Sequence, residues 1–291
     1  MAEEINAMTL DWMDIGGATL RLGGPLCLAA MAGLISERSG VINIGLEGKM
    51  LAAAAGTSFV SAMTGNPLLG IAVGIASAVL FALLHAISVI VFRIDHVVSG
   101  MAINAVSFGI TGYLAKLLTA RGADQDFDSI PQPVFILFAI AAPLLIAWAL
   151  RSTNWGLRLT AVGHSGAKSR EAGVDPVKVR WNAQLWVGVL AGISGAMLVS
   201  QPEQFGVGMT AGRGFIALAA LIFGGWRPIP TALAAFSFGF FDALQLRLQG
   251  EKVAGVEWPS QMWAALPYLL TLIALAGFLM KSRQPAALGK E

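Results

Sequence analysis

The chain has 291 residues, of which 56% are hydrophobic and only 12% are charged, and its formal net charge is +2 at pH 7. Soluble domains carry about 25% charged residues, so this composition excludes an ordinary soluble fold and indicates a protein whose solvent is lipid. So small a net charge, with no basic face, excludes nucleic acid as a partner. The single cysteine, Cys27, lies in an apolar run, which excludes a disulfide framework and predicts a buried side chain.

Long apolar segments recur along the whole chain. A helix that crosses a bilayer needs about 20 mainly apolar residues, because its backbone groups must pair within the segment. We therefore predict an all-α membrane helix bundle, with residues 1–291 forming a single transmembrane domain. The predicted spans, about nine in number, are Ile15–Ile35, Leu46–Met63, Pro67–Phe92, Val97–Leu118, Val134–Leu150, Ala183–Ser200, Gly214–Phe223, Pro228–Leu246 and Met262–Met280.

Two of these spans are unusual. Leu46–Met63 carries Glu47 and Lys49 at its start. Gly214–Phe223 is too short to cross about 30 Å, which is typical of half of a broken helix packed inside protein. A weak similarity between Ile44–Gly56 and Gly225–Phe236, each a polar turn followed by an alanine-rich span, predicts a pseudo-symmetric inverted repeat of the kind found in transporters.

Basic residues in the short loops predict the orientation. Arg93, the loop Arg151–Asn182, Arg227 and the C-terminal tail all fall on one side, which we expect to be cytoplasmic. This places the N-terminus outside and the C-terminus inside. Tryptophans near the span ends predict an interfacial aromatic belt; they are Trp155, Trp181, Trp226, Trp258 and Trp263.

The segment Ser36–Met50, SERSGVINIGLEGKM, permits two interpretations: a solvated turn, or a discontinuous helix whose free backbone groups line a passage. Asn43 and Glu47 are spaced to share one helix face. With Asn104 and Ser107 of the fourth span they are our candidate passage-lining residues, although hydrogen bonding between helices would also use such groups.

Two further features concern packing inside the spans. His85 lies mid-span, where a bond from its ring to a backbone carbonyl is expected, and Gly188 and Gly192 have the small-xxx-small spacing that favours close packing within the bundle over a dedicated dimer face.

The sequence contains no HExxH, GxSxG or Walker-type phosphate loop, so we predict no catalytic, cofactor-binding or metal-binding residues and no enzymatic activity. The spans hold few carboxylates, chiefly Glu47 and Asp242, whereas proton-coupled carriers use such groups. Uphill transport would then need an external motor, a separate ATPase.

The loop Arg151–Asn182 is the longest polar and basic interruption of the chain. Within it, Ser165–Gly173 is predicted to form a short helix, which ends at a glycine and an Asp-Pro pair. Such a helix would present Lys168, Arg170 and Glu171 to a partner protein. The alternative is a basic loop that only determines topology.

Four segments resemble one protein family. SGVINIGLEGKM, DHVVSGMAINAVSFGITGYL, GLRLTAVGHSGAKSREAGVDPVKVRW and GFIALAALIFGGWRPIPTALAAFSFGF are similar to the permeases of ATP-binding-cassette (ABC) importers for ribose, branched-chain amino acids and nucleosides. The first segment looks most like the nucleoside or simple-sugar branch. The resemblance extends from about Gly23 to Gly277.

The resemblance implies a permease subunit in the bacterial inner membrane, in contact with lipid and working with an ABC ATP-binding subunit, an extracytoplasmic substrate-binding protein and a second, non-identical permease. It implies a nucleoside or related polar cargo; a pentose, a branched-chain amino acid, or a stand-alone secondary carrier are the alternatives. Ala161–Val174 would be the helix that couples to the ATPase, although Thr160 and His164 replace the usual Arg and Glu. The implied coupling residues are Gly163, His164, Ala167, Lys168, Arg170, Glu171 and Gly173.

Overall fold

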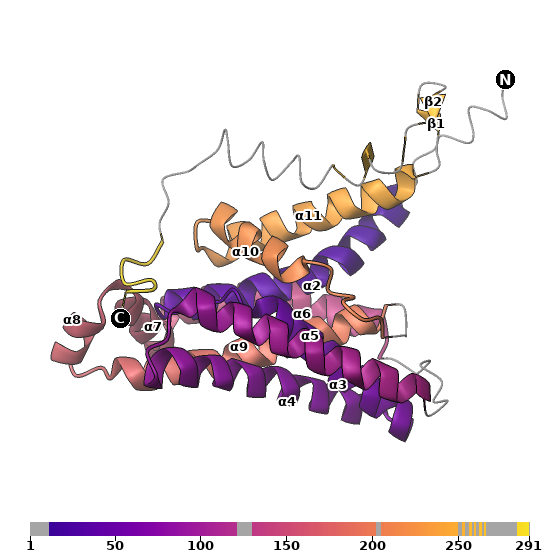
Figure 1. Cartoon of the computed structure of the whole chain (residues 1–291). Helices are drawn as coiled ribbons and strands as arrows, with labels where there is room; N and C mark the ends of the chain where they lie inside the picture. The colour runs from indigo at the N-terminus through magenta and orange to yellow at the C-terminus, as the bar shows by residue number, and fades with distance from the viewer. Residues whose placement is uncertain are drawn as a thin grey trace.

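The computed structural model describes residues 12–120, 130–201, 205–249 and 284–290, with a few positions between 252 and 265. Its helices are α2 (Trp12–Arg38), α3 (Leu46–Thr64), α4 (Pro67–Ala86) continued by the π-helical η1 (Ile87–Val91), α5 (His96–Ala120), α6 (Gln132–Ser152), α7 (Asn154–His164), α8 (Gly166–Glu171), α9 (Pro176–Val199), α10 (Arg213–Phe223) and α11 (Pro228–Leu248) (Figure 1). Two-residue strands, β1 (Lys252–Val253) and β2 (Val256–Glu257), pair antiparallel. Apart from these two short strands, the predicted all-helical architecture is confirmed for the described residues.

Eight of the predicted spans coincide with helices, and the last one, Met262–Met280, lies outside the described residues except for positions 262, 263 and 265. Within the described part, six helices are long and apolar enough to cross a membrane: α2, α4 with η1, α5, α6, α9 and α11. The chain is therefore a multi-pass membrane protein. The shorter or more polar α3 and α10 are not among these six.

Local sequence signals explain where several helices begin. Pro67 and Pro176 occupy the first helical positions of α4 and α9, where proline's missing N–H is not needed. The side chains of Asn66 and Asp175 accept hydrogen bonds from the free N–H groups just beyond them. α9 consequently begins seven residues before the predicted Ala183, inside the segment that we expected to be loop.

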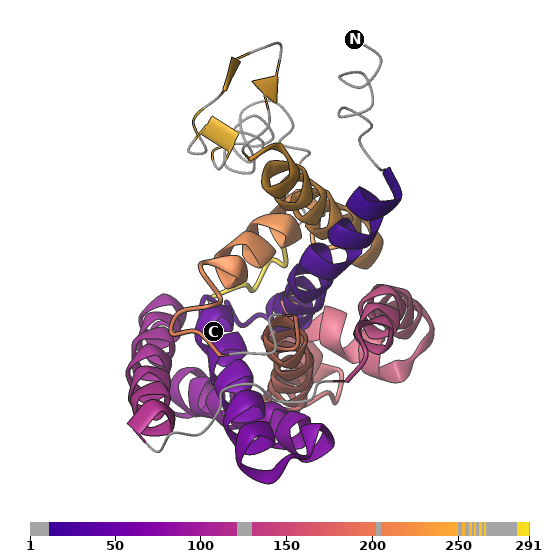
Figure 2. The same ribbon diagram turned by 90° about the vertical axis from the view of Figure 1, so that its right-hand side faces the viewer.

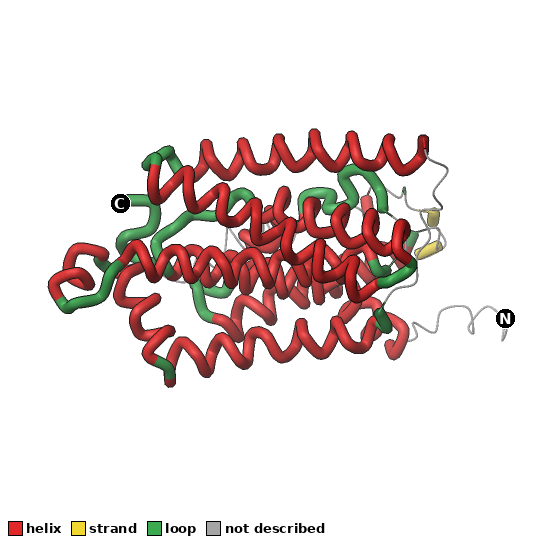
Figure 3. The backbone as a smooth tube through the Cα atoms, turned by 90° about the horizontal axis from the view of Figure 1, so that it is seen from below, coloured by secondary structure: helices red, strands yellow, loops and turns green. Residues whose placement is uncertain are grey.

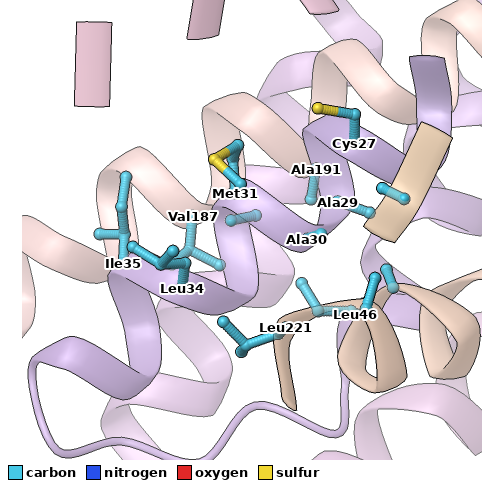
Figure 4. Close-up of a cluster of buried hydrophobic side chains, with 14 of the residues drawn as sticks. Cys27, Ala29, Ala30, Met31, Leu34, Ile35, Leu46, Val187, Ala191 and Leu221 are labelled. Carbon is cyan, nitrogen blue, oxygen red and sulfur yellow. The ribbon is translucent and has the colours of Figure 1, made fainter. Parts of the chain in front are cut away.

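The bundle has an internal and an external set of helices. The most apolar windows of α2 and α9 are 72% and 67% buried, whereas those of the other four candidate spans are 22–33% buried. Large apolar side chains such as Phe108 on α5, Leu137 on α6 and Leu233 on α11 are exposed, as lipid contact requires. Figure 4 shows the core where α2, α3, α9 and α10 meet, with Met31, Leu46 and Val187 among its buried side chains.

Close helix packing confirms two predictions. A Cβ at Gly188 would lie 2.5 Å from the Cα of Val79, and one at Gly192 would lie 2.7 Å from the Cα of Ile75. These glycines therefore let α9 approach α4 within the bundle. The Cys27 side chain is fully buried and its thiol lies 3.4 Å from the carbonyl oxygen of Ala139.

The helices run roughly along one axis, so that the molecule has two ends (Figures 1 and 3). α7, α8 and residues 284–290 lie at one end, which we call the α8 end, and the first turn of α2 lies at the other. Seen along the bundle, α10 and α11 pack beside α2, away from α4 and α5 (Figure 2).

Candidate functional site

The segment Ser36–Met50 is a turn between helices, but it is not solvated. α2 ends at Arg38 and α3 begins at Leu46. The side chains of Asn43 and Lys49 are fully buried and that of Glu47 is 1% exposed. The interpretation as a solvated turn is wrong, because the apolar residues interleaved with these polar ones pack against neighbouring helices and carry the polar groups inside.

Two residues of α5 hold the first turn of α3. The N–H of Gly48 donates to Asn104 Oδ1 at 2.8 Å, and Asn104 Nδ2 donates to the Ile44 carbonyl at 3.1 Å. The Ser107 hydroxyl donates to the Gly48 carbonyl at 2.6 Å. A Cβ at Gly48 would lie 2.9 Å from the Cα of Asn104, so glycine is needed for this close approach. Asn104 thus satisfies a free N–H at the start of a helix.

Glu47 holds the start of another helix. Its Oε1 accepts from the N–H of Gly212 at 2.8 Å and its Oε2 accepts from the N–H of Gly214 at 2.6 Å. These N–H groups belong to the beginning of α10, where the helix dipole favours a negative charge. Gly212 has a φ of +83°, a left-handed conformation that suits glycine. The predicted half-helix therefore begins on a buried carboxylate.

The four predicted passage residues, Asn43, Glu47, Asn104 and Ser107, are thus brought together around the first turn of α3. Asn43 Oδ1 accepts from the buried ammonium of Lys49. Each of the four bonds to the protein itself, and none of them lines the three cavities described among the resolved helices. Their direct effect is to join α3, α5 and α10.

Two histidines hold the turn before α3. His85 Nε2 donates to the Ile42 carbonyl at 3.1 Å, as predicted for this residue, and His85 Nδ1 lies 2.9 Å from Ser99 Oγ. The N–H of Ile42 donates to His96 Nδ1 at 3.1 Å. Sequence reasoning missed His96, whose partner lies 54 residues away along the chain.

A second set of hydrogen bonds links the end of α2 to the turn that follows α10. The Trp226 indole N–H donates to Glu37 Oε2 at 2.6 Å, while Arg38 Nε and Nη2 donate to the Trp226 carbonyl at 3.0 and 2.8 Å. Trp226 is 5% exposed. Its predicted place in an interfacial belt is wrong, because a buried carboxylate takes the N–H that would otherwise face the headgroups. No local pattern predicts this contact between residues 189 positions apart.

The predicted short helix is confirmed as α8, and the Ser165 side chain caps it by accepting from the Lys168 N–H at 3.3 Å. The segment Ala161–Val174 is not one helix, however. Ser165 is extended, with a φ of −162° and a ψ of 112°, so the last turn of α7 and all of α8 form two helical pieces.

Six of the seven predicted coupling residues are exposed, and they are His164, Ala167, Lys168, Arg170, Glu171 and Gly173. The seventh, Gly163, is buried. A Cβ there would collide with the Arg38 carbonyl, and the Gly163 carbonyl accepts from the Ala287 N–H at 3.0 Å. Gly163 therefore packs α7 against the end of α2, while the other six form a surface.

No group of three or more His, Cys, Asp or Glu side chains in the described ranges could hold a metal ion. The polar groups described above instead join helices or face outward.

Comparison with known proteins gives consistent matches. Residues 17–275 match the family described as the permease component of branched-chain amino acid transport systems. The guanosine ABC transporter permease protein NupQ of Bacillus subtilis is 33% identical over 94% of each chain. The nucleoside ABC transporter permease protein NupC of Lactococcus lactis is 33% identical over 91% of this chain and 92% of its own.

Two further relatives match most of the chain. The putative glucose ABC transporter permease protein TsgC13 of Haloferax volcanii is 34% identical over 89% of each chain. Bacillus subtilis has a second match, the guanosine ABC transporter permease protein NupP, which is 25% identical over 77% of this chain.

Proposed function

The chain belongs to the permease family of branched-chain amino acid transport systems, and we propose that it is the permease subunit of an ABC importer for a nucleoside or a related small polar solute. The observation that carries the proposal is the similarity, over more than nine tenths of the chain, to two permeases named for guanosine and for nucleosides. A binding protein would deliver the solute and a separate ATPase would supply the energy.

Uptake into vesicles tests this proposal. Vesicles that hold the complete transporter should accumulate guanosine or another nucleoside in the presence of the binding protein and ATP. Preferential uptake of ribose, glucose or leucine would contradict the nucleoside cargo. Uptake by this chain alone, without ATP, would indicate a stand-alone secondary carrier and contradict the importer.

We propose that the residues 151–182 form the coupling loop, in which the ATPase docks on α8. The support is the outward direction of Lys168, Arg170 and Glu171 at one end of the bundle. A movement of the docked ATPase would push on α8. The push would reach the end of α2, because Gly163 in the last turn of α7 packs against Arg38. α8 and the bundle would then move together when the ATPases close.

Charge reversal tests the coupling proposal. Lys168→Glu with Arg170→Glu should abolish co-purification of the ATPase and ATP-driven uptake. An ATPase surface that complements the two basic side chains would be acidic, and it would repel the new carboxylates. Lys178→Glu, which changes an exposed residue at the same end that lies on the membrane-spanning α9 and not on α8, should leave both unchanged. Normal co-purification of the doubly reversed variant would contradict the proposal.

We propose that the solute passage lies beside α10, between this chain and a second, non-identical permease. α10 has 11 residues, so it is about 16 Å long, roughly half of a bilayer core. Non-helical backbone precedes it, and such backbone at membrane depth needs protein or a water-filled passage beside it. This chain does not fully cover that region, because the side chains of Val207 before α10 and of Phe215 and Ile222 on α10 are 64%, 43% and 46% exposed.

A second permease would cover these side chains, and two distinct guanosine permease proteins in one bacterium support a non-identical pair. Asn43, Glu47, Asn104 and Ser107 would act on the passage by holding its wall. Native mass spectrometry of the purified transporter should then detect two permeases of different mass. Two copies of this chain in one complex would contradict the non-identical pair.

We propose that the α8 end is cytoplasmic, with the N-terminus outside, the C-terminus inside and Met262–Met280 as a further span, so that about nine helices cross or enter the bilayer. Basic residues at the α8 end support this orientation, including Arg93, Arg151, Arg158, Arg227 and Lys290. The inverted repeat also stays a proposal; it is supported by Ile44–Gly56 and Gly225–Phe236, which each run from a turn into a helix, α3 and α11.

Cysteine labelling tests the orientation cleanly, because the natural Cys27 is buried. A membrane-impermeant maleimide should label Lys178→Cys, an exposed position at the α8 end outside α8 itself, only in inside-out vesicles and Asn66→Cys only in intact cells. The reverse pattern would contradict the proposed topology.

A further inference from the structure

A cavity of about 530 Å³ lies at the α8 end between the ends of several helices. Three arginines from separate parts of the chain line it: Arg38 at the end of α2, Arg151 in the last turn of α6, and Arg227 just before α11. Thr160 of α7 adds a hydroxyl. No residue of α8 lines this cavity, so it is separate from the proposed ATPase-docking surface.

The charge inside this cavity is unbalanced. Among the described residues, no carboxylate lines it. The nearest acidic residue in sequence, Glu37, is 6% exposed and accepts the Trp226 indole N–H. Arg38 is held in place by its two bonds to the Trp226 carbonyl, and the like charge of Arg227 acts on it. An anion in the cavity would relieve this repulsion.

The remaining wall of the cavity is apolar and continues onto the lipid-facing surface. Ala147, Leu150 and Ile229 line it. Leu144, Ala147 and Arg151 share one face of α6, and Leu144 is 57% exposed. A ligand that fits this cavity therefore has an anionic head and an apolar body.

We propose that this cavity binds the phosphate headgroup of an anionic phospholipid from the membrane leaflet at the α8 end. Guanidinium groups bind phosphate through paired hydrogen bonds, and basic pockets between membrane helices bind anionic headgroups. The volume exceeds that of a phosphate ion, and the apolar wall accommodates the start of the acyl chains. The lipid joins α2, α6 and the turn before α11, because each contributes one arginine.

Native mass spectrometry of the purified transporter, with phosphatidylglycerol or phosphatidylcholine added, tests the proposal. The wild type should retain phosphatidylglycerol about tenfold better than phosphatidylcholine. Arg151→Gln with Arg227→Gln should abolish this preference. Arg38 is left unchanged because it also bonds to Trp226. Arg158→Gln with Lys178→Gln removes the same charge at the same end from exposed positions outside the cavity, and should keep the preference.

Three results would overturn the proposal. The double arginine variant could retain phosphatidylglycerol as the wild type does. The control variant could lose it equally, which would indicate general attraction to the surface charge. Inorganic phosphate could displace the lipid and raise the unfolding temperature as much as the lipid does, which would assign the cavity to a free anion.

A charge-preserving variant keeps the test valid if the glutamine variant fails to fold. Arg151→Lys with Arg227→Lys retains the charges but loses the paired geometry of the guanidinium groups. It should fold and bind phosphatidylglycerol more weakly than the wild type. Undiminished selectivity in this variant would contradict headgroup recognition by the arginines.

Discussion

The start of α3 and the α8 segment both interrupt the apolar chain with polar residues, and the structure treats them in opposite ways. The start of α3, with Asn43, Glu47 and Lys49, is buried among other helices. The α8 segment, with Lys168 and Arg170, faces outward at the end of the bundle. Both are charged and rich in glycine, so composition alone does not separate them.

The difference lies in what surrounds each polar group. Near α3, apolar residues alternate with the polar ones, and a buried carboxylate without a partner would cost free energy. Glu47 accordingly accepts two backbone N–H groups. The charges of α8 stay in water and are available to another protein. The first segment therefore supports the fold, whereas the second supports contact.

The largest expected effect comes from removing the carboxylate at the α3 start. Glu47→Ala leaves two backbone N–H groups of α10 without an acceptor, at about 1–3 kcal/mol each. We expect a clear fall in the midpoint of thermal unfolding in detergent. Glu171→Ala on the exposed α8 removes a carboxylate too and should leave the midpoint unchanged; equal effects would remove the distinction between the two segments.

The second effect comes from adding one methyl group where the start of α10 meets the start of α3. A Cβ at Gly214 would lie 2.5 Å from the Glu47 nitrogen, so Gly214→Ala should destabilise by about 1–3 kcal/mol through overpacking. Gly109→Ala on α5 has open space around it and should be neutral in the same unfolding measurement. A tolerated Gly214→Ala would show that α10 does not need this close approach.

A smaller effect concerns the helix cap in the exposed segment. Ser165→Ala removes the acceptor for the Lys168 N–H and should destabilise α8 by about 1 kcal/mol. Faster hydrogen exchange of the α8 amides, with an unchanged unfolding midpoint for the whole bundle, is the expected result. A fall in that midpoint would mean that α8 also supports the core.

The smallest effect on stability is expected for the charge reversals in α8. Exposed substitutions away from special features usually change stability by less than about 0.5 kcal/mol. Lys168→Glu with Arg170→Glu should therefore unfold at the wild-type temperature even though it is expected to lose the ATPase. A large stability loss would show that these residues stabilise the fold, as Glu47 does through its two hydrogen bonds.

Much of the secondary structure could be predicted from the sequence. Apolar length identified the spans within the described residues, and prolines and capping residues such as Asn66 and Asp175 mark helix starts. The short helix α8 follows from a polar stretch that ends at glycine. These features are local, because helix formation depends on neighbouring residues and on whether a segment is apolar enough for lipid.

Only the tertiary structure decided which polar groups meet. Glu47 bonds to residues that follow it by 165 and 167 positions. Trp226 is 189 residues from the Glu37 carboxylate that turns it inward. The partner of a buried polar group is selected by the packing of helices that are distant along the chain, and no local periodicity records that choice. The sequence by itself therefore determined where the helices form and that lipid surrounds them. The tertiary packing determined which polar groups link one helix to another.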